Sequence, residues 1–151
     1  MIPNLSLRNF KGVSASYSFA AGNYIHGPNF AGKTAIDQAI RCLVLGYVPG
    51  VAKTAAGLRQ FASDLPMSVS ADPVLGQRLA VAFDRVKNAV KQTEDATLAG
   101  KLDEATTVLF DPSTFFNLAD SARISKAAEL VRASEISVEA VNQAVEAVLS
   151  G

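Results

Sequence analysis

The sequence predicts an α/β fold in which a mixed sheet with antiparallel N-terminal strands is flanked by helices. Three observations predict it. Polar and apolar residues alternate over two stretches near the N-terminus, which is typical of half-buried strands. A glycine-rich turn follows at residues 27–32, and the chain after it repeats apolar residues with helical spacing. Further along, alternating stretches and helical repeats both recur, so the sequence favours neither an all-α nor an all-β fold.

The N-terminal residues are expected to form strands joined by tight turns. Residues 5–8 alternate leucine with polar residues, and residues 13–19 place serine at every second position. Lys11-Gly12 supplies the turn between these two strands. A third short strand is expected over residues 23–26, directly before the glycine-rich turn. The sequence thus predicts a strand, a turn and a helix in succession.

The helix after the turn is expected to begin at Thr34 and to end near Gly46, ahead of Pro49-Gly50. One face of this helix carries the apolar residues Ile36, Ile40, Leu43 and Val44. A second helix is expected within residues 51–65, because Pro66 then interrupts the chain. Cys42, the single cysteine, lies in the apolar helical pattern and is expected to be a small buried hydrophobic residue.

The remaining residues are expected to form a hairpin, an excursion and further helices. Strand-like alternation flanks a turn at residues 73–76, which predicts a hairpin over residues 67–86. Residues 88–105 are polar and are expected to form an exposed excursion. A strand is expected at residues 106–110, and helices are expected to begin at Asp120 and Ser137, each of which can act as a cap.

Composition restricts the class of protein. The chain has 151 residues, of which 49% are hydrophobic, and this is consistent with one globular domain over residues 1–151. No apolar run approaches the roughly 20 residues that a membrane helix needs, and the N-terminus does not resemble a signal peptide. A cytoplasmic protein without a membrane partner is therefore expected. The net charge is zero, which gives no indication of nucleic-acid binding.

Residues 27–34, GPNFAGKT, match the phosphate-binding pattern G-x-x-x-x-G-K-[ST] in full. Backbone N–H groups of residues 29–34 are expected to surround phosphates, assisted by the partial positive charge at the start of the next helix. Lys33 is expected to bridge the outer phosphates as the catalytic lysine, and the Thr34 hydroxyl to bind Mg²⁺. ATP and Mg²⁺ are the expected ligands. The loop residues expected to bind the nucleotide are Gly27, Pro28, Asn29, Phe30, Ala31, Gly32, Lys33, Thr34 and Ala35.

His26, the only histidine, directly precedes this loop. Its place at the end of the expected strand favours a packing or hydrogen-bonding role over catalysis.

Together, the opening LSLRNFKG and the loop GPNFAGKT resemble the N-terminal half of the ABC-class ATPases of the SMC, RecF and SbcC type, which include phage recombination ATPases. The first 50 residues carry this resemblance well, and the later hairpin and the segment LFDPSTFFNLADSARI carry it more loosely. The matching residues are Leu5, Leu7, Asn9, Phe10, Lys11, Gly27, Asn29, Ala31, Gly32, Lys33 and Thr34. The resemblance implies the N-terminal lobe of a P-loop NTPase.

The resemblance also implies further site residues. The segment from Arg8 to Lys11 is expected to lie near the nucleotide, so both basic side chains are candidate ligands. The chain after residues 106–110 is expected near Mg²⁺ and the attacking water. The family often has glutamine in that region, whereas this chain offers Asp111 as the candidate metal ligand. Phe30 stands where the family commonly has glycine, so its backbone is expected to lie outside the left-handed region.

In the family, a signature motif near S-G-G and a strand of four apolar residues followed by Asp-Glu complete the active site. This chain offers no clear match to either motif, because Arg85 follows Asp84 and Pro112 follows Asp111. The resemblance therefore implies an incomplete ATPase lobe, whose partner is a second ATPase half or a second copy. DNA is an expected partner by resemblance alone, through roles in DNA repair, recombination or processing.

Two alternatives remain open from the sequence. One is a small self-contained P-loop kinase or NTPase, with Asp111 or Asp84 on the Mg²⁺ side and Arg85 or Arg123 holding phosphate. The other is a non-catalytic module whose nucleotide-bound state captures a partner.

Overall fold

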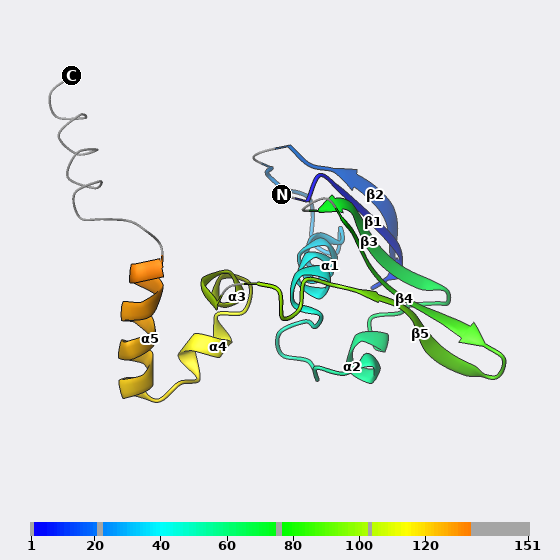
Figure 1. The fold of residues 1–151 in the computed structure, drawn as a ribbon. Helices are drawn as coiled ribbons and strands as arrows, with labels where there is room; N and C mark the ends of the chain where they lie inside the picture. Colours follow the sequence, from blue (N-terminus) through cyan, green and yellow to red (C-terminus); the bar gives the residue numbers. More distant parts are fainter. Residues whose placement is uncertain (1, 21–22, 75–76, 103, 134–151) are drawn as a thin grey trace, which may run out of the picture. The chain divides into compact units, whose positions relative to one another are not determined.

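A computed structural model describes residues 2–20, 23–74, 77–102 and 104–133 (Figure 1). The chain divides into two compact units, Met1–Leu102 and Asp103–Gly151, which are described separately below. The elements confirm a mixed α/β protein with antiparallel N-terminal strands. Within the described residues, every helix is too short or too polar to cross a membrane.

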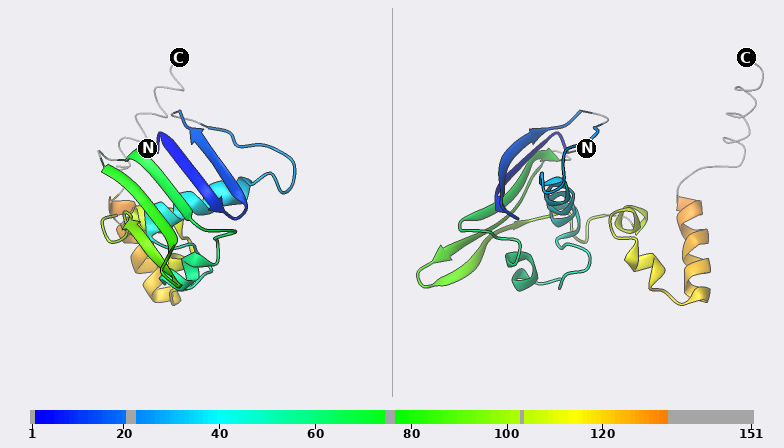
Figure 2. Two further views of the ribbon diagram at one scale, coloured as in Figure 1. Left: turned by 90° about the vertical axis from the view of Figure 1, so that its right-hand side faces the viewer. Right: turned by 180° about the vertical axis from the view of Figure 1, so that it is seen from behind.

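The first unit is built on a five-stranded antiparallel sheet with the strand order β2-β1-β3-β4-β5. Figure 2 shows these strands side by side. The strands are β1 (Asn4–Phe10), β2 (Val13–Ser18), β3 (Met67–Val74), β4 (Gln77–Val86) and β5 (Ala89–Ala96). The expected N-terminal strand pair and the expected hairpin are therefore both confirmed.

Alternation along the strands explains why the sheet has one buried and one exposed face. Leu5 and Leu7 are buried, whereas Ser6 between them is exposed and meets Ser16 of β2 at 2.9 Å between hydroxyl oxygens. Successive side chains of a strand point to opposite faces, so one register fixes which residues enter the core.

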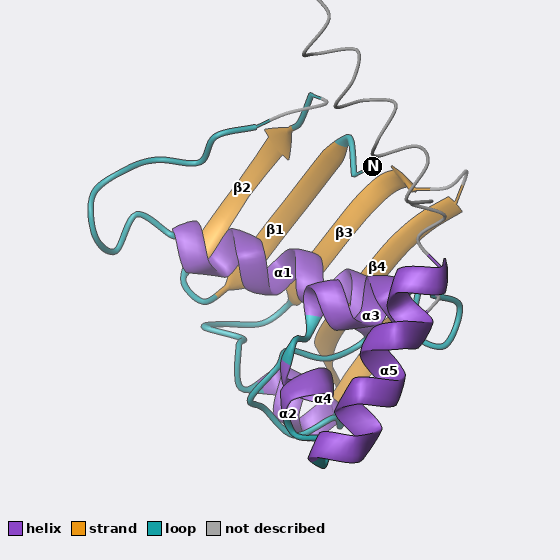
Figure 3. Ribbon diagram, turned by 90° about the vertical axis from the view of Figure 1, so that its left-hand side faces the viewer, coloured by secondary structure: helices purple, strands orange, loops and turns teal. Residues whose placement is uncertain are grey.

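Helix α1 (Lys33–Leu45) lies across the buried face of the sheet (Figure 3). It ends at Gly46, as expected, whose φ of 77° is the left-handed conformation that glycine adopts readily at a helix C-terminus. Cys42 is buried in the core, which confirms its predicted role as a small hydrophobic residue. The core joins apolar residues of α1 to those of the strands, with Phe10, Leu5, Leu43, Met67, Leu79, Val69 and Val81 among its most buried side chains.

The expected helix over residues 51–65 is much shorter. Only α2 (Ala55–Arg59) forms, and the Thr54 side chain accepts a hydrogen bond from its first turn. The helix stops because the chain after it turns back to the β1–β2 turn, where the Phe61 carbonyl accepts a bond from the Lys11 N–H at 2.7 Å. A tertiary contact therefore overrides the local helical pattern.

The exposed excursion expected over residues 88–105 is wrong for residues 89–96, because these residues form β5 and pair with β4. β5 is an edge strand whose side chains alternate between exposed and half-buried positions. An edge strand tolerates charges such as Lys91 and Asp95, which also hinder pairing with other chains. The polar residues of this segment therefore reflect the exposed position of an edge strand and do not exclude a strand.

The second unit is helical where it is described, with α3 (Glu104–Phe110), α4 (Ser113–Phe116) and α5 (Asp120–Ala133). The helix expected to begin at Asp120 is confirmed. The strand expected at residues 106–110 is wrong: these residues belong to α3, and the Asp111 N–H bonds the Thr107 carbonyl at 2.8 Å, which continues the helical pattern. Local helical hydrogen bonds here prevail over the β propensity of Thr and Val. The helix expected from Ser137 lies outside the described residues.

Candidate phosphate-binding loop

Residues 27–32 form an irregular loop that leads directly into α1. An open hollow of about 600 Å³ lies over this junction, a volume usual for small-molecule sites. Its lining combines the loop with one residue distant in sequence: Lys11, Asn29, Phe30, Ala31, Gly32, Lys33, Thr34 and Ala35. The fold therefore brings Lys11, at the β1–β2 turn, together with the glycine-rich motif.

Gly32 is the residue on which α1 begins, and its position requires glycine for two reasons. Its φ is 85°, and a Cβ atom added there would lie 2.9 Å from Cγ2 of Val13. No side chain caps this helix end, and the first turn carries no acidic residue. The partial positive charge at the N-terminus of α1 is therefore not offset by a local carboxylate, which favours an anion at this position.

Lys33 folds back across the loop that precedes it. Its Nζ atom donates hydrogen bonds to the Gly27 carbonyl at 2.8 Å and the Pro28 carbonyl at 2.7 Å. Both acceptors are neutral, so these bonds position the ammonium group without cancelling its charge. The neighbouring Thr34 is exposed and lines the hollow.

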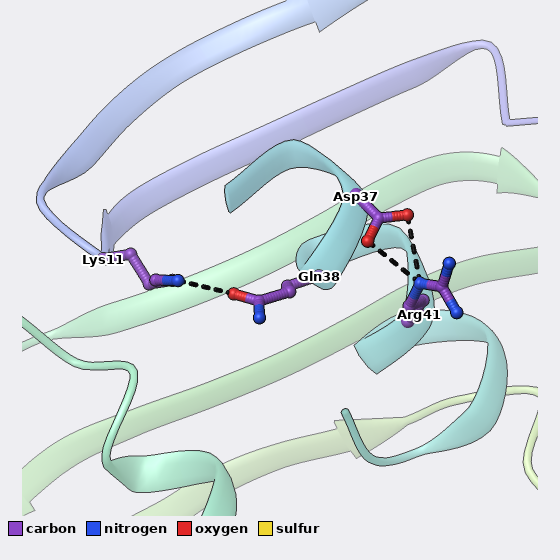
Figure 4. Close-up of polar contacts among 4 residues, drawn as sticks. All are labelled: Lys11, Asp37, Gln38 and Arg41. Atoms are coloured by element: carbon purple, nitrogen blue, oxygen red, sulfur yellow. Dashed lines mark hydrogen bonds and ion pairs between the residues drawn. The ribbon is translucent and has the colours of Figure 1, made fainter. Parts of the chain in front are cut away.

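Lys11 approaches the hollow from the β1–β2 turn. Its Nζ atom donates to Oε1 of Gln38 on α1 at 2.7 Å (Figure 4). The same atom lies 5.9 Å from the centre of the Phe61 ring. Gln38 is also a neutral acceptor. The lining thus contains two lysines and no acidic side chain, so its charge favours an anionic ligand.

An acidic residue does occur on α1 beside Gln38. The Asp37 carboxylate accepts a hydrogen bond from Arg41 Nε, which lies 3.0 Å from each carboxylate oxygen. Figure 4 shows this pair next to the Lys11–Gln38 contact. Arg41 offsets the charge of Asp37, which limits how far that carboxylate reduces the positive potential of the hollow.

The strand expected at residues 23–26 does not form. Tyr24 is 88% exposed and Ile25 is 42% exposed, and the Tyr24 ring stacks on His26 with 5.7 Å between ring centres. A strand before a glycine-rich loop needs neighbours to satisfy its backbone groups, and the described strands pair only among themselves.

Phe30 also departs from expectation. Its φ of 66° lies in the left-handed region, whereas the sequence predicted a backbone outside that region. The Phe30 ring is fully exposed, at 105%. A bulky residue in this conformation costs on the order of 1–3 kcal/mol and is typical of functional loops.

The remaining predicted residues lie outside the hollow. Arg8 is exposed on β1 and does not belong to the lining. Asp111 lies in the second unit, where it is buried and its carboxylate accepts a hydrogen bond from the Ser113 hydroxyl. Thr34 lies in the first unit, so their joint role in binding a metal stays a prediction. No cluster of three or more His, Cys, Asp or Glu suited to a metal occurs within the described residues.

The residues of the self-contained alternative have local partners. The Asp84 carboxylate accepts a bond from the Arg85 N–H at 2.7 Å, at the exposed end of β4. Arg123 Nη2 donates to the Leu118 carbonyl at 3.0 Å and lies 3.4 Å from Asp120, which ties the start of α5 to the preceding turn.

Cys42 has the chemistry of a structural residue. Burial, with a smaller contribution from the charge of Asp95, raises the pKa of its thiol from 9.0 to about 12. The thiol therefore stays protonated near neutral pH, which argues against a nucleophile or a metal ligand.

Comparisons with protein-family models, with curated proteins and with solved structures gave no match to this chain.

Proposed function

We propose that this chain is the ATP-binding lobe of an SMC/RecF/SbcC-like ATPase, which couples ATP binding and hydrolysis to dimerisation and to DNA repair, recombination or processing. The observation that carries the proposal is the hollow that residues 29–34 of the phosphate-loop motif line together with a second lysine, Lys11. The DNA-related role rests on the resemblance of LSLRNFKG and GPNFAGKT to that family.

The hollow suits a polyphosphate ligand. The helix end at Gly32 lacks an acidic side chain, and Lys33 and Lys11 are held by neutral oxygens. In the proposal, backbone N–H groups of residues 29–34 and the Lys33 ammonium hold the phosphates. The exposed Thr34 hydroxyl would hold Mg²⁺, which offsets phosphate charge when bound.

The segment before the loop supports an incomplete site. Residues 23–26 leave Tyr24 and Ile25 exposed beside a motif that ordinarily follows a paired strand. A second ATPase half, supplied by another segment or another copy, would give this segment neighbours and contribute the missing catalytic groups. The isolated chain is accordingly expected to bind nucleotide weakly and to hydrolyse it slowly.

Nucleotide titration tests the proposal. Isothermal titration calorimetry at low salt should detect MgATP binding to the wild-type chain. K33A should weaken that binding by about tenfold or more, because it removes charge-assisted hydrogen bonds to phosphate. K91A removes a lysine from the exposed edge strand β5 and serves as the matched control, with unchanged affinity.

Two results would contradict the proposal in different ways. Absence of MgATP binding, or equal affinities for wild type and K33A, would remove the phosphate-loop assignment. Rapid ATP hydrolysis by the purified chain alone, abolished by D111N, would instead favour the self-contained kinase or NTPase.

A further inference from the structure

We infer that Gln38 is a positioning residue that holds Lys11 as the second phosphate-binding cation of the hollow. The inference rests on the proposed function and deepens it, because two separate lysines select a ligand with more than one phosphoryl group. The observation behind it is the 2.7 Å bond between Lys11 Nζ and Gln38 Oε1, shown in Figure 4.

The backbone of Lys11 is fixed before its side chain is considered. Its φ is 51°, and its N–H donates to the Phe61 carbonyl at 2.7 Å. The preceding Phe10 is fully buried and stacks on Phe61, with 5.4 Å between ring centres. The Asn9 carbonyl accepts a bond from the Ser63 N–H at 2.9 Å. The turn therefore presents Lys11 from one constant position at the edge of the hollow.

The side chain of Lys11 still has several rotatable bonds, and ordering a free lysine on a ligand costs entropy. Gln38 reduces that cost because it orders the side chain before any ligand binds. The amide oxygen takes one of the three N–H donors of the ammonium group and leaves two donors and the full charge. A carboxylate at the same position would order Lys11 equally well but would neutralise it, as Asp37 and Arg41 neutralise each other one residue earlier on α1.

Two cations from different elements suit an extended anion. Lys33 belongs to the start of α1 and binds back to the loop, whereas Lys11 comes from the β1–β2 turn. Both line the same hollow of about 600 Å³. A single phosphate held by the loop engages the Lys33 side of the hollow, and further phosphoryl groups are needed to engage Lys11 as well. The inferred ligand class is therefore a di- or triphosphate rather than orthophosphate.

A double-mutant cycle tests the inference. K11M, Q38M and the double variant are titrated with MgATP, inorganic triphosphate and orthophosphate, and K33A is included in the same series. Q38M should weaken MgATP and triphosphate binding by about threefold to tenfold, in the range of measured couplings between contacting residues. It should have no further effect in the K11M background. Orthophosphate affinity should be the same in all variants except K33A.

Q92M provides the matched Gln-to-Met control on β5, and melting temperatures report whether each variant is folded. Gln38 is half-buried, so Q38N serves as a second variant should Q38M unfold the chain. Q38N also lacks the reach to the Lys11 ammonium and should weaken triphosphate binding in a folded chain. An NMR titration adds a direct measurement, because the Gln38 side-chain amide resonances should shift on addition of triphosphate.

Additive effects of K11M and Q38M on triphosphate affinity would overturn the inference, as would unchanged triphosphate affinity in folded Q38M or Q38N. If K33A still weakened MgATP binding in that case, the proposed function would stand. Equal MgATP affinities for wild type and K33A, or no MgATP binding to the wild-type chain, would overturn the proposed function and the inference with it.

Discussion

The two walls of the hollow differ in how the fold supports them. Asn9 near the end of β1 and Lys11 in the β1–β2 turn have φ values of 52° and 51°, and the core fixes this wall through Phe10 and the Phe61 carbonyl. The glycine-rich loop opposite also contains a left-handed residue, Phe30, but its ring is fully exposed. Its contacts are short-range, such as the bonds from Lys33 Nζ to Gly27 and Pro28.

This difference separates strain that is stabilised within the chain from strain that is not. Tertiary hydrogen bonds and aromatic packing offset the unusual backbone of the turn. The loop has no comparable buried anchor at Phe30. In the proposed function, a ligand or a second ATPase half would stabilise its unusual backbone. The turn is therefore the preformed wall of the hollow, and the loop is the wall that binding is expected to stabilise.

The largest expected effect comes from the buried anchor of the turn. F10A should lower the free energy of unfolding by about 3–5 kcal/mol, because it removes a fully buried aromatic ring from the core. Urea unfolding followed by circular dichroism measures this change. F30A removes the same group from the loop and should change the stability by less than about 0.5 kcal/mol. Similar losses in both variants would contradict the contrast between the walls.

A smaller effect is expected at Asn9, whose Nδ2 donates to the Pro66 carbonyl at 2.9 Å. N9A should cost about 2 kcal/mol, since it removes this bond and places alanine in the left-handed region. N9G loses the same bond but accepts the backbone conformation, so its cost should be smaller. Equal stabilities for N9A and N9G in urea unfolding would show that the conformation contributes nothing.

The sequence predicted those elements whose pattern is complete within a short segment. Alternation around Leu5 and Leu7 predicted β1, and the helical repeat that ends at Gly46 predicted α1. Each pattern indicates which face of the strand or helix is buried and where that element ends. Residues 106–110 were assigned wrongly because a short run of Thr, Val, Leu and Phe is compatible with either a strand or a helix, and only its neighbours decide between them.

The parts of the candidate site differ in how far a sequence pattern can mark them. The loop motif is local, so spacing alone marks its residues, and residues 29–34 of the motif line one hollow in the structure. Gln38 was missed because no local pattern marks it: its role follows from the distance to Lys11, which is 27 positions away in the sequence. The strand at residues 23–26 was predicted from composition, but pairing requires neighbours that the composition of one segment does not supply.

At the loop itself, the backbone of Phe30 allows a finer test. F30G should be more stable than F30A by about 1 kcal/mol, because the left-handed conformation penalises any residue with a Cβ atom. This order is the reverse of that expected where the backbone is regular, since glycine is ordinarily the less favourable residue. Urea unfolding of both variants measures the difference. Greater stability of F30A would contradict the left-handed conformation of the loop.

The smallest expected effect comes from Cys42, which lies on the buried side of α1. Its folded pKa of about 12 exceeds the ordinary value of 9.0, so the unfolded chain releases this proton first as the pH rises. The contribution to stability is complete below pH 9 and declines between pH 9 and 12, by less than about 1 kcal/mol at pH 9.5. Urea unfolding of wild type and C42A at pH 7.5 and 9.5 isolates this change, since other titrating groups are common to both. An identical pH dependence in the two proteins would show that the thiol is not protected, and that α1 is less firmly packed beneath the hollow than its burial indicates.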